Sequence, residues 1–106
     1  MNRRYRVIET SLAFDDYINI TEHIGQWTGD WPLAVRTVDL IHEYIKGMRD
    51  TPHRGNKHDD LRPGLCIVPF RERTTIAFEI DDTAMVVSIL RVFYGGQDYE
   101  TLMHGS

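Results

Sequence analysis

Apolar residues recur at helical spacing along the first half of the chain and predict two amphipathic helices. The first helix is expected over 12–27, with Ser11 as its N-cap and Gly29 at its end. The second is expected over 32–49, with Asp30 as its N-cap. The first apolar stripe comprises Tyr17, Ile20, Ile24 and Trp27, and the second comprises Ala34, Val38, Ile41, Ile45 and Met48. Because the link between the helices is short, they should form an antiparallel hairpin.

Alternating apolar and polar residues predict a sheet in the second half, preceded by a short strand at the N-terminus. The expected strands cover 4–9, 64–70, 73–80 and 85–94. The last run is apolar on both faces, which is typical of a strand with a neighbour on each side. Asp81 and Asp82 favour a turn, and the short links favour antiparallel pairing. The pattern therefore predicts an α+β fold in which the hairpin packs on a mostly antiparallel sheet. Four residues should then be buried: Ile41, Ile45, Phe78 and Ile89.

Length and composition are those of one domain. The chain has 106 residues, enough for a single modest core. The polar segment 51–62 is expected to be a loop within that domain. No apolar run approaches the ~20 residues of a membrane span, and no secretory signal is present at the N-terminus. The lone cysteine, Cys66, suits a reducing cytoplasm and should be a small buried residue.

The charge balance argues against general nucleic-acid binding. Twelve basic residues stand against sixteen acidic ones, which gives a net charge of −4. Lysine occurs only at positions 46 and 57. Proteins that hold nucleic acid by its backbone usually carry a basic surface, because neutralising phosphates supplies much of the affinity. The spacing of histidines and cysteine also fits no metal site, and we expect no cofactor.

Four segments of the second half resemble, in order and spacing, the RelE/ParE superfamily of bacterial type II toxins. They are DLRPGL (60–65), RERTTIAFEI (71–80), VSILRVFYGG (87–96) and QDYETLM (97–103). With the helical first half, the resemblance covers nearly the whole chain and implies a short C-terminal helix. The ending LRVFYGGQDYETLM is similar to that of the ParE branch. Two positions depart from that branch: Gln97 replaces a common arginine, and Tyr94 replaces a frequent histidine.

The resemblance to ParE implies an interaction protein rather than an enzyme. ParE proteins are understood to poison DNA gyrase by protein–protein contact and to be neutralised by a ParD-like antitoxin, so that DNA is met only through the antitoxin. The implied target-contacting residues are Arg54, Arg62, Arg71, Arg73, Arg91, Tyr94 and Gln97. The antitoxin should lay an amphipathic segment along the hairpin and sheet edge, with Trp27, Trp31 and Tyr44 as candidate anchors. For Trp27, packing into the core is the favoured alternative.

The RelE branch implies a different activity, which is ribosome-dependent mRNA cleavage. There a 2′-hydroxyl attacks the neighbouring phosphate, while basic groups hold the developing charge and an acid or base moves the proton. The residues available for this role are His53, Arg54, Arg73, Arg91 and Tyr94. Alternatively, the arginines are solvated or paired with nearby carboxylates, namely Glu72, Asp81, Asp82 and Asp98. The acidic, lysine-poor composition favours ParE. A third hypothesis is a degenerate toxin that retains only antitoxin binding and operon autoregulation.

Overall fold

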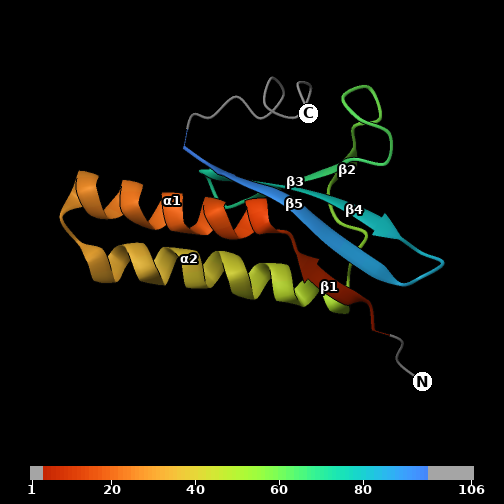
Figure 1. The fold of residues 1–106 in the computed structure, drawn as a ribbon, viewed down its shortest axis with the longest axis horizontal. Coiled ribbons are helices and arrows are strands. Elements are labelled where there is room, and N and C mark those ends of the chain that lie inside the picture. The colour runs from red at the N-terminus through yellow and green to blue at the C-terminus, as the bar shows by residue number, and fades with distance from the viewer. Residues whose placement is uncertain (1–3, 96–106) are drawn as a thin grey trace.

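A hairpin of two long helices packs on one face of a five-stranded sheet (Figure 1). The structure is a computed structural model that describes residues 4–95. Its elements are β1 (Arg6–Glu9), α1 (Ser11–Thr28), α2 (Trp31–Lys46), the 3-10 turn η1 (Gly47–Arg49), β2 (Asn56–Lys57), β3 (Cys66–Phe70), β4 (Thr74–Asp81) and β5 (Val86–Tyr94). The predicted α+β fold is confirmed. The short C-terminal helix expected at 97–103 lies outside the described residues.

The strands lie in the order β1-β5-β4-β3-β2. β5 pairs in parallel with β1 and antiparallel with β4, where Thr74 faces Tyr94. It therefore has a neighbour on each side, which confirms the prediction from its two apolar faces. β2 falls within the segment expected to be a loop, and pairs antiparallel with β3. A strand of two residues leaves no alternating pattern by which to predict it.

The N-cap of α1 differs from the predicted one. The cap is Thr10 rather than Ser11, and its hydroxyl accepts a hydrogen bond from the Ala13 amide at 3.4 Å. The same hydroxyl donates to the carbonyl of Ile89 in β5 at 2.8 Å. Because this bond fixes Thr10 where β1 ends, Ser11 becomes the first helical residue.

The second helix begins as predicted. Asp30 caps α2 and accepts a hydrogen bond from the Leu33 amide at 2.9 Å. The helix ends at Lys46, and the last part of the predicted range 32–49 forms η1 instead. Such a tightened final turn is common at helix ends.

The main core lies between the hairpin and the sheet. Its residues include the four predicted to be buried, Ile41, Ile45, Phe78 and Ile89, each at most 1% exposed. A smaller cluster on the other face of the sheet comprises Leu65, Ile67, Ala77 and Phe93. A register shift between β4 and β5 beside Ala77 changes the alternation of β5, so that Ile89 and Val92 both belong to the main core.

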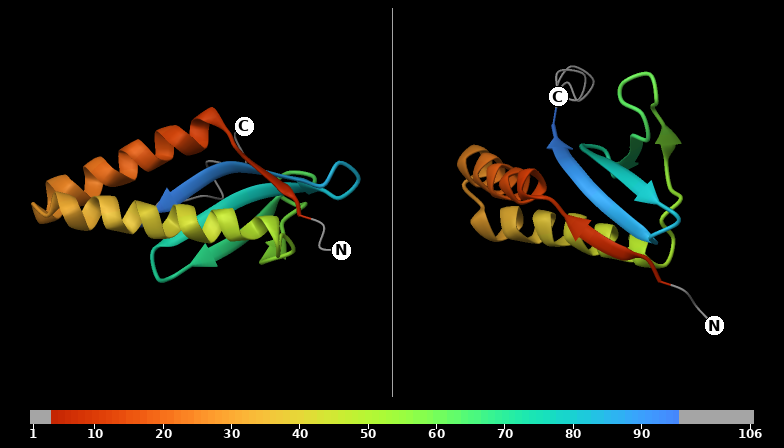
Figure 2. Two further views of the ribbon diagram at one scale, coloured as in Figure 1. Left: turned by 90° about the horizontal axis from the view of Figure 1, so that it is seen from below. Right: turned by 45° about the vertical axis from the view of Figure 1, so that its right-hand side comes forward.

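The tip of the hairpin projects beyond the strands (Figures 1 and 2). Ile24 is buried, but Trp27, one turn further along α1, is 79% exposed. The apolar stripe of α1 extends to Trp27, but the described strands do not reach that part of the helix. The prediction that Trp27 packs into the core is therefore wrong. Trp31, which is 45% exposed, lies against Gly25, where any Cβ would collide with the indole ring.

Candidate functional site

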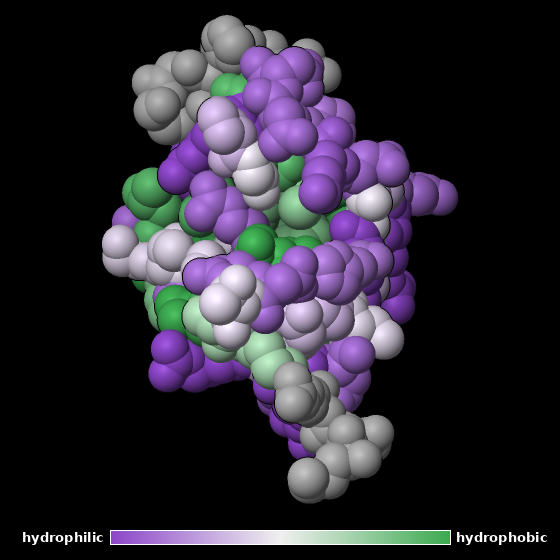
Figure 3. Space-filling view, turned by 90° about the vertical axis from the view of Figure 1, so that its right-hand side faces the viewer, coloured by the Kyte–Doolittle hydropathy of each residue, from purple (hydrophilic) through white to green (hydrophobic). Residues whose placement is uncertain are grey.

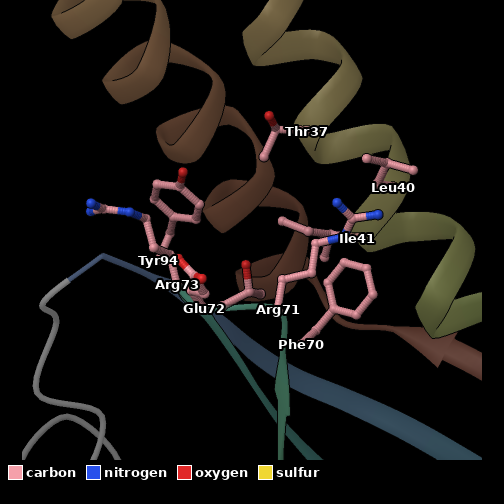
Figure 4. Close-up of a pocket in the computed structure, with 9 residues that line it drawn as sticks. Thr37, Leu40, Ile41, Phe70, Arg71, Glu72, Arg73 and Tyr94 are labelled. Carbon is pink, nitrogen blue, oxygen red and sulfur yellow. The ribbon is translucent and has the colours of Figure 1, made fainter.

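A hollow of about 430 Å³ opens between α2 and the turn that joins β3 to β4. The helix contributes Thr37, Leu40 and Ile41, and the turn contributes Arg71, Glu72 and Arg73. Tyr94, at the end of β5, also lines it. The fold thus brings together three predicted site residues at one end of the sheet: Arg71, Arg73 and Tyr94 (Figure 4).

The two arginines of this hollow diverge. Figure 4 shows Arg71 reaching toward α2 beside Phe70, whereas Arg73 points to the other side, past Tyr94. The Arg71 guanidinium carbon lies 5.4 Å from the centre of the Phe70 ring. Arg71 also has a φ of 58°, a left-handed conformation that residues with side chains rarely adopt. The turn therefore presents two cationic groups in different directions.

Neither Arg71 nor Arg73 is paired with a carboxylate among residues 4–95. Pairing with Glu72, Asp81 or Asp82, the alternative raised by the sequence, is thus not found, and Asp98 lies outside the described residues. Several other arginines are paired. Arg62 lies 3.4 Å from Glu79, for example. Within the part of the chain that the structure describes, the turn therefore carries two arginines that form no ion pair.

Arg91 has a partner that the sequence interpretation missed. Its Nε and Nη2 donate to the two carboxylate oxygens of Asp16 at 2.8 and 2.9 Å. The Val92 amide donates to the same carboxylate at 2.8 Å. Asp16 is only 6% exposed, and its hydrogen bond raises the pKa of Arg91. The pair therefore ties α1 to β5.

One signal for this pair was present in the sequence. Asp16 lies between Ala13, Tyr17 and Ile20 on the buried face of α1, where an isolated carboxylate is costly. Arg91 keeps a side-chain exposure of 24% and lines a second hollow, of about 330 Å³, with His23 and Tyr94. Its contact with a target stays a prediction.

His53 lies at the opposite end of the sheet, beside Asp82. It lines a third hollow with Arg54, Lys57, Ile80 and Asp82, but the Arg54 guanidinium reaches back over Tyr44. Because a strand rises about 3.3 Å per residue, the stretch of β4 from Thr74 to Ile80 spans about 20 Å. The fold therefore does not bring His53 to Arg73 and Tyr94, which leaves Tyr94 as the candidate for proton transfer in the nuclease hypothesis. Figure 3 looks onto this end of the molecule and shows a largely hydrophilic surface.

The polar groups at this end are engaged with one another. His53 Nε2 lies 2.9 Å from Asp82 Oδ1, and the Tyr5 hydroxyl donates to the same oxygen at 2.6 Å. These contacts lower the pKa of Asp82, and the carboxylate raises the pKa of Tyr5. Arg54 donates to the carbonyl of Tyr44 at 3.1 Å, and its guanidinium carbon lies 4.5 Å from the centre of that ring.

The predicted antitoxin anchors fall into two separate places. Trp27 and Trp31 are exposed at the hairpin tip. Tyr44 lies about 20 Å from Trp31 along α2, at about 1.5 Å per residue. Its ring stacks on Phe70, with ring centres 4.5 Å apart. The sequence interpretation missed further exposed apolar residues on the helices, namely Leu12, Phe14, Ile18 and Val35, each at least 50% exposed.

Metal-binding side chains and the single cysteine are the other groups that could carry chemistry. Within residues 4–95, no three His, Cys, Asp or Glu side chains are grouped so that they could hold a metal ion. Cys66 is buried as predicted, and burial raises the pKa of its thiol.

None of the helices within residues 4–95 is long and apolar enough to cross a membrane.

Solved toxin structures share this fold. A chromosomal ParDE toxin–antitoxin system from P. aeruginosa is 20% identical, with a TM-score of 0.72, over 88% of this chain and 98% of that chain. The toxin–antitoxin complex RelBE2 from Mycobacterium tuberculosis is 20% identical, with a TM-score of 0.62, over 86% and 98% of the two chains. A mutant of the E. coli toxin RelE in the free state is 10% identical, with a TM-score of 0.63, over 96% and 95%.

Sequence comparison distinguishes between these branches. No curated protein matches the chain. The family model described as the ParE toxin of the type II toxin–antitoxin system parDE matches residues 7–99. That match spans most of the chain and confirms the resemblance drawn from its second half. The chain therefore belongs to the ParE toxin family of type II toxin–antitoxin systems.

Proposed function

We propose that the chain is a cytoplasmic toxin that inhibits DNA gyrase by direct contact and that a ParD-like antitoxin neutralises it. Membership of the ParE family supports both partners. The observation that most favours binding over catalysis is the position of His53. It lies beside Asp82, whereas Arg73 and Tyr94 lie at the other end of the sheet. A general base must come within hydrogen-bond reach of the proton that it removes.

The target contact is assigned to the end of the sheet that carries Arg71, Arg73 and Tyr94. The two arginines are unpaired among residues 4–95 and available to a partner. Arg54 and Arg91 are held by neighbours within the chain, so they should contribute less to the contact. Arg62 is likewise paired with Glu79. Gln97 lies outside the described residues.

Expression of the toxin without its antitoxin tests the proposal. Plasmid supercoiling and mRNA 5′ ends on translating ribosomes would be measured in the same cells. Gyrase inhibition should change plasmid topology and leave mRNA without codon-positioned cuts. Codon-positioned cuts with unchanged supercoiling would overturn the proposal.

One observation favours the alternative of a RelE-like endoribonuclease. Arg71, Arg73 and Tyr94 line the same hollow, and arginines are well suited to stabilising a phosphorane. Individual substitution of Arg73, Tyr94 and His53 separates the two functions. A catalytic site loses its activity in the single variant that lacks the general base. A binding surface instead loses potency in steps of about 1–3 kcal/mol across several positions.

The antitoxin contact is proposed to include the hairpin tip. Large aromatic residues dominate interface energetics, and Trp27 and Trp31 are both exposed there. Trp27→Ala should weaken antitoxin binding without lowering the thermal midpoint of the toxin. Trp31→Ala removes an indole that packs on Gly25, so its stability must be measured alongside binding. Unchanged affinity in both variants would exclude the tip.

A further inference from the structure

The hollow between α2 and the β3–β4 turn combines charge with apolar surface. Leu40 is 41% exposed there, and Ile41 and Phe70 extend the same wall. Arg71 and Arg73 supply the charge: Arg71 reaches toward α2 beside Phe70, and Arg73 points to the other side (Figure 4). The volume of about 430 Å³ falls within the range of about 300–1,000 Å³ that is typical of ligand sites. A ligand that fits this hollow needs apolar and anionic groups together.

The hollow carries positive charge in an otherwise acidic chain. The protein carries a net charge of −4, and four other arginines pair with carboxylates, namely Arg4, Arg49, Arg62 and Arg91. Arg71 and Arg73 stay without one among residues 4–95. Two exposed arginines on one turn attract negatively charged groups to the hollow. An acidic ligand is therefore favoured.

The geometry distinguishes between kinds of anion. A phosphate needs donors that converge on it, but Arg71 and Arg73 point to different sides of the hollow. Glu72 stands between them, so the turn carries a net charge of only +1. Two carboxylates spaced along a peptide could each meet one arginine and avoid Glu72. A peptide segment fits this arrangement better than a nucleotide does.

We propose that the hollow receives a segment of the antitoxin with two carboxylates that flank an apolar side chain. Arg71 and Arg73 each pair with one carboxylate, and the apolar side chain packs on Leu40 and Phe70. The inference rests on the proposed function, because it assumes an antitoxin partner. It adds that the antitoxin covers the surface assigned to gyrase, so that neutralisation is direct competition.

The test measures the affinity of the toxin for the protein encoded by the adjacent reading frame, both produced by cell-free synthesis. The double variant Arg71→Gln/Arg73→Gln should bind about tenfold more weakly and with a smaller salt dependence. Glu72→Gln should bind about two- to threefold more tightly, because it removes a repulsive carboxylate. The control Arg4→Gln/Arg49→Gln removes two positive charges outside the hollow and should keep the wild-type affinity. Thermal midpoints establish that every variant is folded.

A double-mutant cycle identifies the partner groups. Acidic residues of the antitoxin are replaced in turn by their amides and measured against wild-type toxin and the Arg71→Gln/Arg73→Gln variant. Two of these replacements should weaken binding to wild-type toxin and have no effect on binding to the variant.

Three outcomes would overturn the inference. The first is equal antitoxin affinity of the double variant and the wild type. The second is loss of gyrase inhibition with unchanged antitoxin affinity, which would make the hollow a target surface alone. The third is a wild-type toxin that binds no antitoxin, which would reject the proposed function as well.

Discussion

The two ends of the sheet differ in what their polar side chains contact. At the end with His53, the side chains of His53 and Tyr5 share one oxygen of Asp82. At the other end, Arg71 and Arg73 stand beside an open hollow without an acidic partner among residues 4–95. At the first end, the polar side chains therefore find their hydrogen-bond partners within the chain.

This difference indicates where the functional surface lies. The contacts of His53 and Tyr5 with Asp82 stabilise the fold. They hold together a loop, the residue before β1 and the turn after β4. Unpaired cations next to exposed apolar surface contribute little to folding. We expect these cations to contribute to the free energy of binding when a partner contacts them. The comparison can be tested by substitutions, ordered here from the largest expected effect to the smallest.

Ile41 should be more important for stability than Leu40, although both line the same hollow. Ile41 is 1% exposed and part of the main core, whereas Leu40 is 41% exposed. Ile41→Ala should lower the free energy of unfolding by about 2–4 kcal/mol, and Leu40→Ala by less than about 1 kcal/mol. Urea denaturation measures both values. Similar losses would mean that the hollow is part of the core rather than an open site.

Asp16 should stabilise the junction of α1 and β5. Asp16→Ala leaves the Arg91 guanidinium and the Val92 amide without their acceptor. The free energy of unfolding should fall by about 1–3 kcal/mol, since Arg91 retains some access to water. Asp15→Ala is the control, because Asp15 is exposed on the same helix. If the two variants were equally stable, the Asp16–Arg91 pair would not contribute to the stability of the fold.

Asp82 should contribute a small, pH-dependent stabilisation. Its pKa is lowered because it accepts hydrogen bonds from Tyr5 and His53. A carboxylate with a lowered pKa stabilises the fold at neutral pH and loses that effect as the pH falls through the lowered value. At pH 7, Asp82→Asn should therefore lower the thermal midpoint by about 1–3 °C, and the difference should vanish in acid. A difference that grew in acid would contradict this assignment.

Arg71 and Arg73 should have the smallest effect on stability. The double variant Arg71→Gln/Arg73→Gln should keep the free energy of unfolding within about 0.5 kcal/mol of wild type, because neither side chain has an ion pair to lose among the described residues 4–95. Chemical denaturation checks this value. A clear loss of stability would show that the two ends of the sheet do not differ as described.

The parts of the structure that the sequence predicts are those encoded by local periodicity. The stripe from Ala34 to Met48 places α2 on the sheet, and the two apolar faces of β5 give it two neighbours. Trp27 continues the stripe of α1 but is exposed, because periodicity does not reveal where the sheet ends. The cap at Thr10 likewise depends on a bond to β5.

The site depends on contacts between distant segments, which the sequence does not display. Asp16 and Arg91 are 75 positions apart, and no local pattern links them. The sequence marks Arg71 and Arg91 as equivalent candidates. Only the fold shows that Arg91 is paired with Asp16, whereas Arg71 has no carboxylate partner among residues 4–95. His53 and Tyr94 both look available in the sequence, yet β4 holds them at opposite ends.

Inhibition of DNA supercoiling by purified gyrase tests the central claim most directly. Wild-type toxin is compared with Arg71→Gln/Arg73→Gln and with Arg4→Gln/Arg49→Gln, which removes two paired arginines outside the hollow. The half-inhibitory concentration should rise about tenfold for the first variant and stay within about twofold for the second. Equal shifts in the two variants, or a wild-type toxin that leaves gyrase fully active, would contradict the account.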